Sequence, residues 1–304
     1  MLPRQYVRIA SEVRSALVAG QAVVALESTV IAHGLPRPAN LDTARRIEAA
    51  IREEGAIPAT IGIIDGLVTV GLNDAELEQL ATSEGVRKVS RRDIGIAVAR
   101  GENGATTVAG TMIAAHWAGI RVFATGGIGG VHRGDAGDIS ADLPELAQTP
   151  VAVICAGAKS ILDLPRTLEW LETAGVPVIG YNTDTFPAFY AVSSGLPVDV
   201  CVNSPQEVAN ILQAKWALGL TGGALIVVPP PADLALPAVV MEEAIEQALR
   251  TCAMEGISGK AVTPFLLSCV NEATSGRSLK VNIALLEQNA RVAARVALAL
   301  AGAV

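Results

Sequence analysis

The sequence predicts an α/β layered fold that forms one large domain over residues 1–304. Short apolar runs alternate along the chain with segments of helical periodicity, which is the pattern of a sheet covered by helices. Asp65-Gly66 separates two such runs and is a strong β-hairpin signal, so the sheet contains an antiparallel pair and is mixed. No repeat, low-complexity tract or linker divides the chain, so we expect the C-terminal helical portion, about 240–304, to pack on the same domain.

The predicted elements follow from local signals. Gly20 and Gly55 follow the first two helices, Asn40 can cap the second, and Pro165 lies in the first turn of a later one. The predicted strands cover residues 22–26, 59–64, 67–70, 86–90, 121–124, 151–155, 177–180 and 224–228. The predicted helices cover 11–19, 41–54, 74–81, a segment that ends near 119, 165–174, 205–218, 241–254, 264–273 and 279–299.

The composition limits the classes of partner. With 51% hydrophobic and 17% charged residues, the chain can bury a large core without disulfides or a structural metal. A net charge of −7 argues against nucleic acid as a partner, because phosphate neutralisation needs a basic face, but it allows a small phosphorylated ligand. The absence of an eighteen-residue apolar run argues against a membrane span.

The cysteines and the N-terminus indicate the compartment. The four cysteines form no CxxC pair, and Cys155 lies inside an apolar strand, where a free buried thiol is expected. The first twenty residues carry charges throughout and do not form a secretory signal. These features predict a reduced, cytoplasmic protein.

The segment from Phe123 to Asp163 concentrates groups that can carry chemistry. Five residues, 126–130, include four glycines, and His132-Arg133 and three aspartates follow them: Asp135, Asp138 and Asp142. The glycines can bring backbone N–H groups close to an anion, although the pattern matches neither GxGxxG nor a Walker A motif. His132 and Arg133 are candidates to contact a ligand.

Lys159 follows the predicted strand 151–155, and ligands of α/β sheets bind beyond the carboxyl ends of strands. We expect a helix to begin just after it. The positive end of that helix and partial burial would both disfavour the charged amine, and a neutral amine can form a Schiff base. Binding of a phosphate or an ion pair with Asp163 are the alternatives.

Glu27 ends the strand 22–26 and is placed to act as a general acid or base, with Ser28 and Thr29 as hydrogen-bonding neighbours. Pairing with an arginine or capping of a helix are the alternatives, and from the residues alone they are preferred. Asp138 can bind a hard divalent cation such as Mg²⁺ or Mn²⁺ with water and substrate oxygens as further ligands. Ser140 and Asp142 can instead cap a helix that starts near residue 143.

Several other residues are candidates for substrate contacts. Lys88, with Arg91 and Arg92 close behind, can meet a phosphate or form a solvated basic turn. The segment 104–108 precedes a helix and offers backbone N–H groups to an anion. Asn282 and Asn289 share one face of the last helix, where asparagine is mildly unfavourable, which indicates a polar role for one of them. Contacts with packing partners on a neighbouring helix are the alternative explanation.

The residues alone predict a cytoplasmic α/β enzyme that acts on a small phosphorylated carbonyl compound or sugar. A Schiff-base aldolase or lyase, a sugar-phosphate hydrolase and a kinase all remain compatible with them.

Long segments resemble the pseudouridine-5′-phosphate glycosidase family, whose members are also called pseudouridylate synthases and share a fold with indigoidine synthase A. The similar segments extend from Val23 to about Leu286 and read VVALESTVIAHGLP, KVSRRD, NGATTVAGTM, VFATGGIGGVHRG, DISADL, CAGAKSILD, TPFLL and SLKVNIALL. The resemblance implies a three-layer α/β/α fold with a mostly parallel central sheet and a homotrimer. It also implies reversible cleavage of the C–C glycosidic bond of pseudouridine 5′-phosphate to uracil and ribose 5-phosphate, with one Mn²⁺ per subunit.

The resemblance also implies residue roles. Lys159 of GAKS is the nucleophile that forms an imine with ring-opened ribose, Glu27 of ALEST is the proton donor, and Asp138 of DISAD holds the metal. The residues implied to line the phosphosugar site are Lys88, Val108, Ser140, Ala141 and Asp142. Thr125, His132 and Asn282 are implied to lie near the substrate, with Asn282 addressing uracil.

Overall fold

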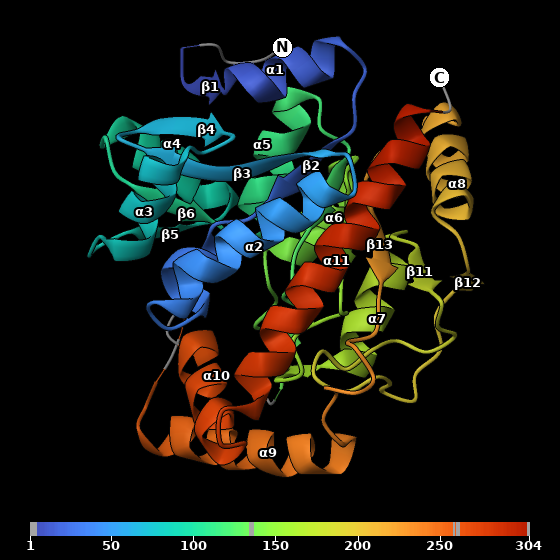
Figure 1. The fold of residues 1–304 in the computed structure, drawn as a ribbon. Helices are drawn as coiled ribbons and strands as arrows, with labels where there is room; N and C mark the ends of the chain where they lie inside the picture. The colour runs from blue at the N-terminus through green and yellow to red at the C-terminus, as the bar shows by residue number, and fades with distance from the viewer. Residues whose placement is uncertain (1–4, 134–136, 258, 260–261, 303–304) are drawn as a thin grey trace.

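The structure is a computed structural model that describes residues 5–133, 137–257, 259 and 262–302 (Figure 1). Asp135 lies outside the described residues. The main sheet has eleven strands within the described residues, and two further strands, β8 and β10, form a small antiparallel pair. The strands are β1 (Val7–Ile9), β2 (Val23–Leu26), β3 (Ile57–Ile64), β4 (Leu67–Val70), β5 (Arg87–Val89), β6 (Gly104–Thr106), β7 (Val122–Ala124), β8 (Val131–His132), β9 (Ala152–Cys155), β10 (Leu162–Asp163), β11 (Val178–Tyr181), β12 (Val200–Val202) and β13 (Ala224–Val227).

The helices are distributed along the whole chain. They are α1 (Ser11–Val18), the π-helix η1 (Val30–Gly34), α2 (Ala39–Glu53), α3 (Asp74–Thr82), α4 (Arg91–Ala99), α5 (Val108–Ala118), α6 (Asp142–Gln148), α7 (Leu164–Thr173), α8 (Pro205–Ala217), α9 (Ala238–Met254), α10 (Val262–Ala273) and α11 (Arg277–Ala301). None of the helices in the described part of the chain is long and apolar enough to span a membrane.

The sheet is mixed and mostly parallel, as predicted. Its strand order is β1-β4-β3-β2-β7-β9-β13-β11-β12, and the pairs from β3 through β12 are all parallel. The predicted hairpin joins β3 and β4 antiparallel, with Ile64 opposite Leu67. Asp65 and Gly66 both have positive φ, 49° and 78°, which is the requirement of a type I′ turn.

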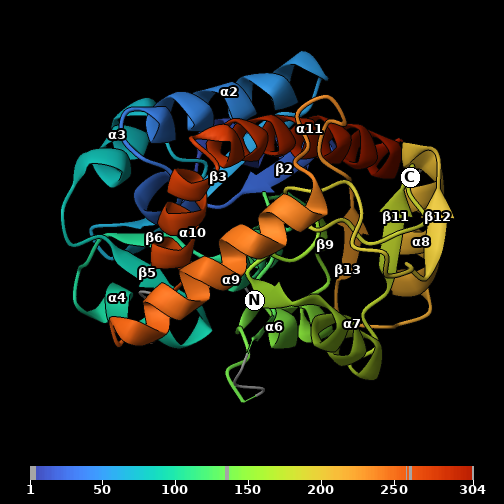
Figure 2. The same ribbon diagram turned by 90° about the horizontal axis from the view of Figure 1, so that it is seen from below.

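Helices cover both faces of the sheet. α2 and α11 lie on one face, where α11 contacts β2, β7 and β9, whereas α5 packs on the other face. Figure 2 shows α2 and α11 on one side of the strands and α6 and α7 on the opposite side. The α/β/α layering is therefore confirmed. α9 and α10 pack against each other at the end of the molecule opposite α1 (Figure 1).

Residues 91–99 form a helix, α4, that the sequence pattern did not predict. A solvated basic turn was one of the two interpretations of this segment, and it is wrong because the helix begins at Arg91. The Asp93 carboxylate accepts a hydrogen bond from the Ser90 backbone N–H at 3.1 Å, as in a capping box. The Ser-x-x-Asp pattern was the signal for this helix start.

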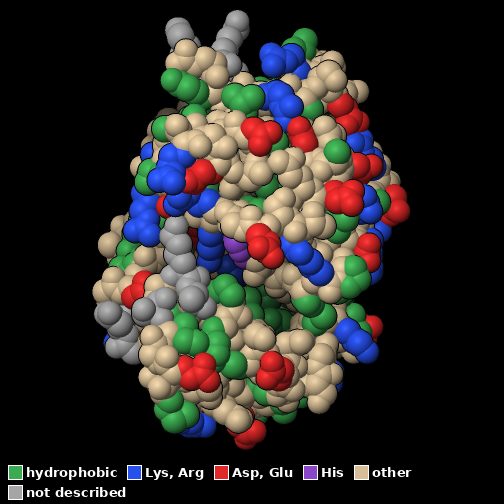
Figure 3. All heavy atoms as spheres, turned by 90° about the vertical axis from the view of Figure 1, so that its left-hand side faces the viewer, with side chains coloured by type: hydrophobic (Ala, Val, Ile, Leu, Met, Phe, Trp, Pro, Cys, Tyr) green, Lys and Arg blue, Asp and Glu red, His purple; other side chains and the backbone are tan. Residues whose placement is uncertain are grey.

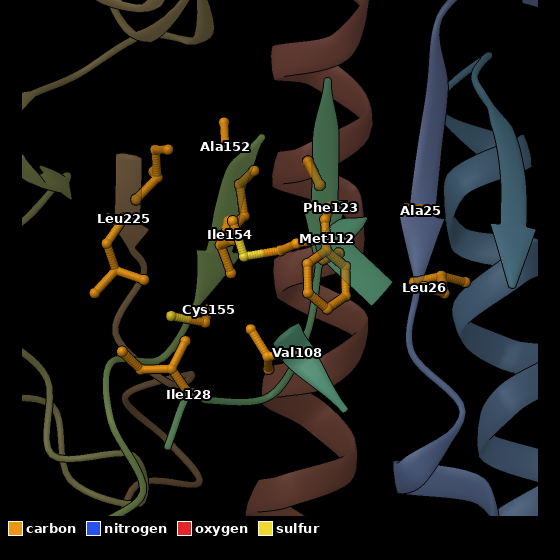
Figure 4. Packing of buried hydrophobic residues seen from close by; sticks show 14 of the residues in the cluster. Ala25, Leu26, Val108, Met112, Phe123, Ile128, Ala152, Ile154, Cys155 and Leu225 are labelled. Atoms are coloured by element: carbon orange, nitrogen blue, oxygen red, sulfur yellow. The ribbon is translucent and has the colours of Figure 1, made fainter. Parts of the chain in front are cut away.

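The core beneath the site is continuous and apolar. One buried hydrophobic cluster contains residues of the sheet and of α5, α9 and α11. Figure 4 shows Met112 of α5 among Phe123 of β7 and Ile154 and Cys155 of β9, all fully buried. Such packing has few voids, so removing a large side chain leaves a cavity.

Met112→Ala is therefore expected to lower the free energy of unfolding by about 2–5 kcal/mol, from lost burial and an unfilled cavity. Chemical denaturation with an unchanged m-value measures the difference. Met254 is 80% exposed on α9, so Met254→Ala is the matched control and should change stability by less than about 0.5 kcal/mol. Equal losses in the two variants would contradict the assigned core.

Candidate active site

A cavity of about 760 Å³ lies beyond the carboxyl ends of β2, β7 and β9. This edge is where open α/β sheets bind ligands. The cavity is lined by all the residues to which the family resemblance gives a role: Glu27, Lys88, Val108, Thr125, His132, Asp138, Ser140, Ala141, Asp142, Lys159 and Asn282. Figure 3 shows the hollowed middle of this face, in which basic side chains and a histidine are visible. Segments distant in sequence therefore form one site.

Glu27 directly follows β2 and is half-buried. One carboxylate oxygen accepts a hydrogen bond from the hydroxyl of Thr29, and the other accepts one from the hydroxyl of Thr125. Within the described chain, no arginine pairs with Glu27, so the arginine alternative is wrong. Its carboxyl group is thus oriented from both sides at the wall of the cavity.

Ser28 has a structural role next to Glu27. Its side chain is fully buried, its hydroxyl donates to the carbonyl of Ile61 at 2.7 Å, and it accepts from the N–H of Thr106 at 2.9 Å. These bonds tie the end of β2 to β3 and β6. The turn that carries Glu27 is therefore fixed by buried polar contacts.

Lys159 is positioned by backbone hydrogen bonds to the glycine loop, residues 126–130. The N–H of Lys159 donates to the carbonyl of Ile128 at 3.1 Å, and the N–H of Ile128 donates to the carbonyl of Gly157 at 3.0 Å. The chain after β9 and the chain after β7 thus continue side by side past the last paired residues of the sheet. This pairing brings the lysine to the cavity.

The expected helix directly after Lys159 is absent. The chain instead enters β10, and α7 starts only at Leu164, because Pro165 fixes the first turn and Asp163 caps it through the N–H of Arg166 at 3.0 Å. The predicted effect of a helix N-terminus on the charge of Lys159 is therefore wrong. The ion pair with Asp163 is also wrong, since Asp163 faces Arg166 at 3.6 Å.

Lys159 has surroundings that suit a nucleophile. It is half-buried, and none of the carboxylates in the described ranges lies within ion-pair distance of its amine. Cys155 lies fully buried at the end of β9, and burial raises the pKa of its thiol to about 12, although the positive charge of Lys159 acts in the opposite direction. Cys155 is a free, buried thiol, as predicted.

The glycine loop serves close packing between protein groups. A Cβ at Gly127 would lie 2.6 Å from the ring of Phe189, and a Cβ at Gly129 or Gly130 would clash with the hydroxyls of Ser140 or Thr167. The N–H of Gly129 donates at 2.8 Å to an anion that belongs to the protein, the carboxylate of Asp142. The glycines allow the segments that line the cavity to approach one another.

Asp142 joins two walls of the cavity. One carboxylate oxygen accepts from the N–H of Ala109 in the first turn of α5 at 3.0 Å, and the other accepts from Gly129. The side chain is buried, with 5% exposure. The capping interpretation of Ser140 and Asp142 is wrong, because Ala141 is the N-cap of α6 and, among the described residues, no side chain caps this helix. The Ser140 hydroxyl accepts from the N–H of Asp142 at 3.3 Å. Asp142 therefore orders the site through backbone groups.

Cationic groups and a helix N-terminus form another wall. Lys88 on β5 is half-buried, and Val108 begins α5 at the cavity wall. In this first turn the N–H of Ala109 donates to Asp142 and that of Gly110 to the Thr107 hydroxyl. Arg91 also lines the cavity and makes two hydrogen bonds, 2.7 and 2.8 Å long, to Glu145, which is 1% exposed. The sequence did not predict this role of Glu145, because an acidic residue in the first turn of a helix is common.

Asp138 and His132 lie together near the mouth of the cavity. The Asp138 side chain is 55% exposed, and its Oδ2 lies 3.8 Å from Nδ1 of His132. Arg133 has a structural role instead of a ligand role. Its guanidinium donates to the carbonyls of Ser160 and Leu162 at 3.0 and 3.1 Å and pairs with Glu242 of α9.

Helices α10 and α11 close the cavity on the remaining side. Asn282 is half-buried, and its Oδ1 lies 3.4 Å from the position that a Cβ of Gly126 would occupy. Apolar residues for which the sequence predicted no role also line the cavity, among them Pro264 and Leu267 of α10 and the loop residue Phe189. Asn289 does not line the cavity but donates to the carbonyl of Thr125 at 2.8 Å.

Asp142→Ala is expected to lower the free energy of unfolding by about 2–5 kcal/mol, because two buried backbone N–H groups lose a charged acceptor. Differential scanning calorimetry or denaturant titration measures the loss. Asp233 is exposed in a loop and gives the control variant Asp233→Ala, which should retain wild-type stability. Wild-type stability in Asp142→Ala would show that the two N–H groups do not depend on this carboxylate.

Comparison with known proteins identifies the family. Residues 12–299 match the family model described as indigoidine synthase A like protein. The chain is 55% identical over 298 residues to the pseudouridine-5′-phosphate glycosidase of Caldanaerobacter subterraneus subsp. tengcongensis, covering 97% of each chain. It is 56% identical to the enzyme of the same name from Geobacillus kaustophilus, covering 94% of this chain and 96% of the other.

Two solved structures have the same fold. The prealnumycin C-glycosynthase AlnA, solved in complex with ribulose 5-phosphate, superposes with a TM-score of 0.92 at 43% identity over 99% of each chain. An indigoidine synthase A (IdgA)-like protein from Thermotoga maritima superposes with a TM-score of 0.89 at 38% identity, over 97% of this chain and 96% of that one. The chain belongs to the indigoidine synthase A like family.

Proposed function

We propose that the protein is a pseudouridine-5′-phosphate glycosidase, which reversibly cleaves pseudouridine 5′-phosphate to uracil and ribose 5-phosphate. The observation that carries the proposal is the placement of Lys159 and Glu27 on one cavity, at the ends of β9 and β2. Relatives that are 52–56% identical over nearly the whole chain carry this name, which supports the same substrate here.

The bond to be broken explains why an amine and a carboxyl group are both required. An ordinary glycosidase passes through an oxocarbenium-like state and expels an oxygen or nitrogen leaving group. Uracil attached through carbon is a poor leaving group by that route. An imine offers an alternative, because the nitrogen lone pair can form the C=N bond as the C–C bond breaks.

The steps balance with these two residues and water. The Lys159 amine bonds to C1′, and the ring oxygen leaves as the C4′ hydroxyl. The C1′–C5 bond then breaks, its electron pair stays on uracil C5, and C5 takes the proton from the Glu27 carboxyl. Water hydrolyses the resulting imine, which releases ribose 5-phosphate and restores the amine. The hydroxyls of Thr29 and Thr125 orient the carboxyl group for proton transfer.

The remaining wall residues suit the rest of the substrate. In the proposal, Lys88 and the N-terminus of α5 at Val108 bind the phosphate, and the segment 140–142 lines the phosphosugar. Thr125 and His132 lie beside the ribose, and Asn282 addresses the polar edge of uracil through its amide. Each of these groups faces the same cavity, so one substrate can reach all of them.

A single Mn²⁺ per subunit belongs to the proposal, with Asp138 as its protein ligand. The 55% exposed carboxylate of Asp138 lies on the cavity wall, which suits a hard cation that completes its shell with water and substrate oxygens. The described ranges contain no cluster of three acidic, histidine or cysteine ligands, which fits such an open site better than a closed cage. When bound, the ion supplies positive charge to substrate oxygens.

The assembly and location are proposed from the family resemblance. We expect a homotrimer in the cytoplasm whose partners are the small molecules of the reaction. The net charge of −7 gives no support for a nucleic-acid partner.

Glu27→Gln is expected to lower kcat for release of uracil by about 10²–10⁴-fold, because the carboxamide cannot deliver the proton. The same variant should still form the imine, so borohydride with ribose 5-phosphate adds the sugar mass at Lys159. Lys159→Ala should lose both cleavage and trapping, whereas Lys215→Ala on α8 should keep both.

Mass spectrometry and uracil assays separate the competing functions. Turnover by Lys159→Ala would refute the covalent mechanism. Trapping of ribose 5-phosphate without formation or cleavage of the C-glycoside would instead favour a Schiff-base aldolase.

Asp138→Ala is expected to weaken binding of Mn²⁺ in the presence of ribose 5-phosphate by at least about tenfold, because the proposed protein ligand is lost. Calorimetric titration or electron paramagnetic resonance of free Mn²⁺ measures this without an activity assay. Asp163→Asn keeps a cap for α7 and serves as the control. An unchanged affinity in Asp138→Ala would exclude this residue as the ligand.

A further inference from the structure

Asn289 is a buried polar residue whose presence packing alone does not explain. It lies in the middle of α11, is 1% exposed, and has the fully buried apolar neighbours Leu285 and Ala290. Its Nδ2 donates to the carbonyl of Thr125 at 2.8 Å, and its Oδ1 has no partner among the described residues. An apolar side chain would avoid burying an unpaired oxygen and would suit a helix better.

The Thr125 carbonyl, to which Asn289 donates, does not make the hydrogen bond that a regular parallel sheet would give it. The N–H of Ala152 donates to the carbonyl of Arg121. Paired parallel strands advance together, so four residues further along both strands the N–H of Ala156 should donate to the carbonyl of Thr125. Instead, Ala156 donates to the carbonyl of Gly126 at 2.8 Å, while the N–H of Thr125 keeps its bond to Ile154 at 3.0 Å. The bonded positions thus move on by one residue on both chains, and Ile128 pairs with Ala158 in the same register as Val122 with Ala152. This local irregularity is a bulge shared by the two chains, and in it the Thr125 carbonyl turns toward Asn289 of α11.

The bulge matters because of the side chain that it directs. The Thr125 hydroxyl donates to Oε1 of Glu27, which directly follows the neighbouring strand β2. Bulges next to active sites commonly re-aim one side chain. Ile154 fixes the N–H of Thr125 and Asn289 fixes its carbonyl, so the backbone is held on both sides of the side chain that carries this hydroxyl.

We infer that Asn289 is a positioning residue for proton transfer. It holds the Thr125 carbonyl out of the ladder, the bulge aims the Thr125 hydroxyl at Glu27, and the carboxyl group is thereby fixed for delivery of a proton to uracil. This role rests on the proposed function. Asn289 does not line the cavity, so it acts through Thr125 and affects the proton-transfer step without affecting imine formation at Lys159.

Asn289→Leu tests the inference, since leucine has a similar size and cannot donate. We expect kcat for cleavage to fall about ten- to hundredfold, as for a small misplacement of a reacting group, with KM and borohydride trapping at Lys159 unchanged. If Asn289→Leu does not fold, kcat, KM and borohydride trapping are measured on Asn289→Ala instead. Gln288 is the matched control, because its Nε2 donates to the carbonyl of Pro229 at 2.8 Å, and Gln288→Leu should leave kcat unchanged.

A double-mutant cycle shows whether Asn289 acts through Thr125. Thr125→Val removes the hydroxyl, so adding Asn289→Leu to it should cause no further loss of kcat. Multiplicative losses, an equal loss in Gln288→Leu, or loss of trapping together with kcat would each overturn the inference.

Crystal structures of the wild type and Asn289→Leu give a readout independent of activity. The inference expects the N–H of Ala156 to bond to the carbonyl of Thr125 in the variant, and the Thr125 hydroxyl to leave Glu27. An unchanged contact between Thr125 and Glu27 would overturn it. A wild-type protein that does not cleave pseudouridine 5′-phosphate would sink the proposed function, while the comparison of crystal structures would still decide the role of Asn289.

Discussion

The backbone pairing between the glycine loop and the segment after β9 determines the geometry of the site. Hydrogen bonds from Ala156 to Gly126, from Ile128 to Gly157 and from Lys159 to Ile128 carry the sheet beyond its last regular residues. These bonds fix the backbone of Lys159, so only the conformation of its side chain decides where the amine lies in the cavity. A reactive group on such a support needs little reorganisation when substrate binds.

This pairing depends on small residues, and it connects the site to the rest of the fold. The ring of Phe189 and the hydroxyls of Ser140 and Thr167 fill the spaces that Cβ atoms of the loop would need. Asp142 then joins the loop to the first turn of α5. The loop is therefore a packed junction between the sheet, α5 and α6, which explains how a glycine-rich sequence can hold a fixed geometry at the cavity.

The sequence predicted the strands that carry the site better than the connections between them. Apolar runs predicted β2, β7 and β9 to within a residue or two. Glu27, Thr125 and Lys159 follow the carboxyl ends of these three parallel strands. The prediction failed after Lys159, where a helix was expected, because the pairing with Ile128 is a long-range contact that no local pattern encodes. The role of Glu145 was also hidden, since an acid in a first helical turn is ordinary until its partner Arg91 is known.

The candidate residues extend from Glu27 to Asn282, so the site exists only when α11 has docked on the sheet. The exposed ion pairs of α11, such as Arg295 with Glu54, contribute little to that docking because water screens them. Its buried apolar face, which includes Val281 and Leu285, supplies most of the stabilisation through loss of water-exposed area. Asn289 interrupts this face and leaves a buried oxygen unpaired, which costs about 1–3 kcal/mol. By our inference, this loss of stability at the contact between α11 and β7 accompanies a fixed position of the Thr125 hydroxyl beside Glu27.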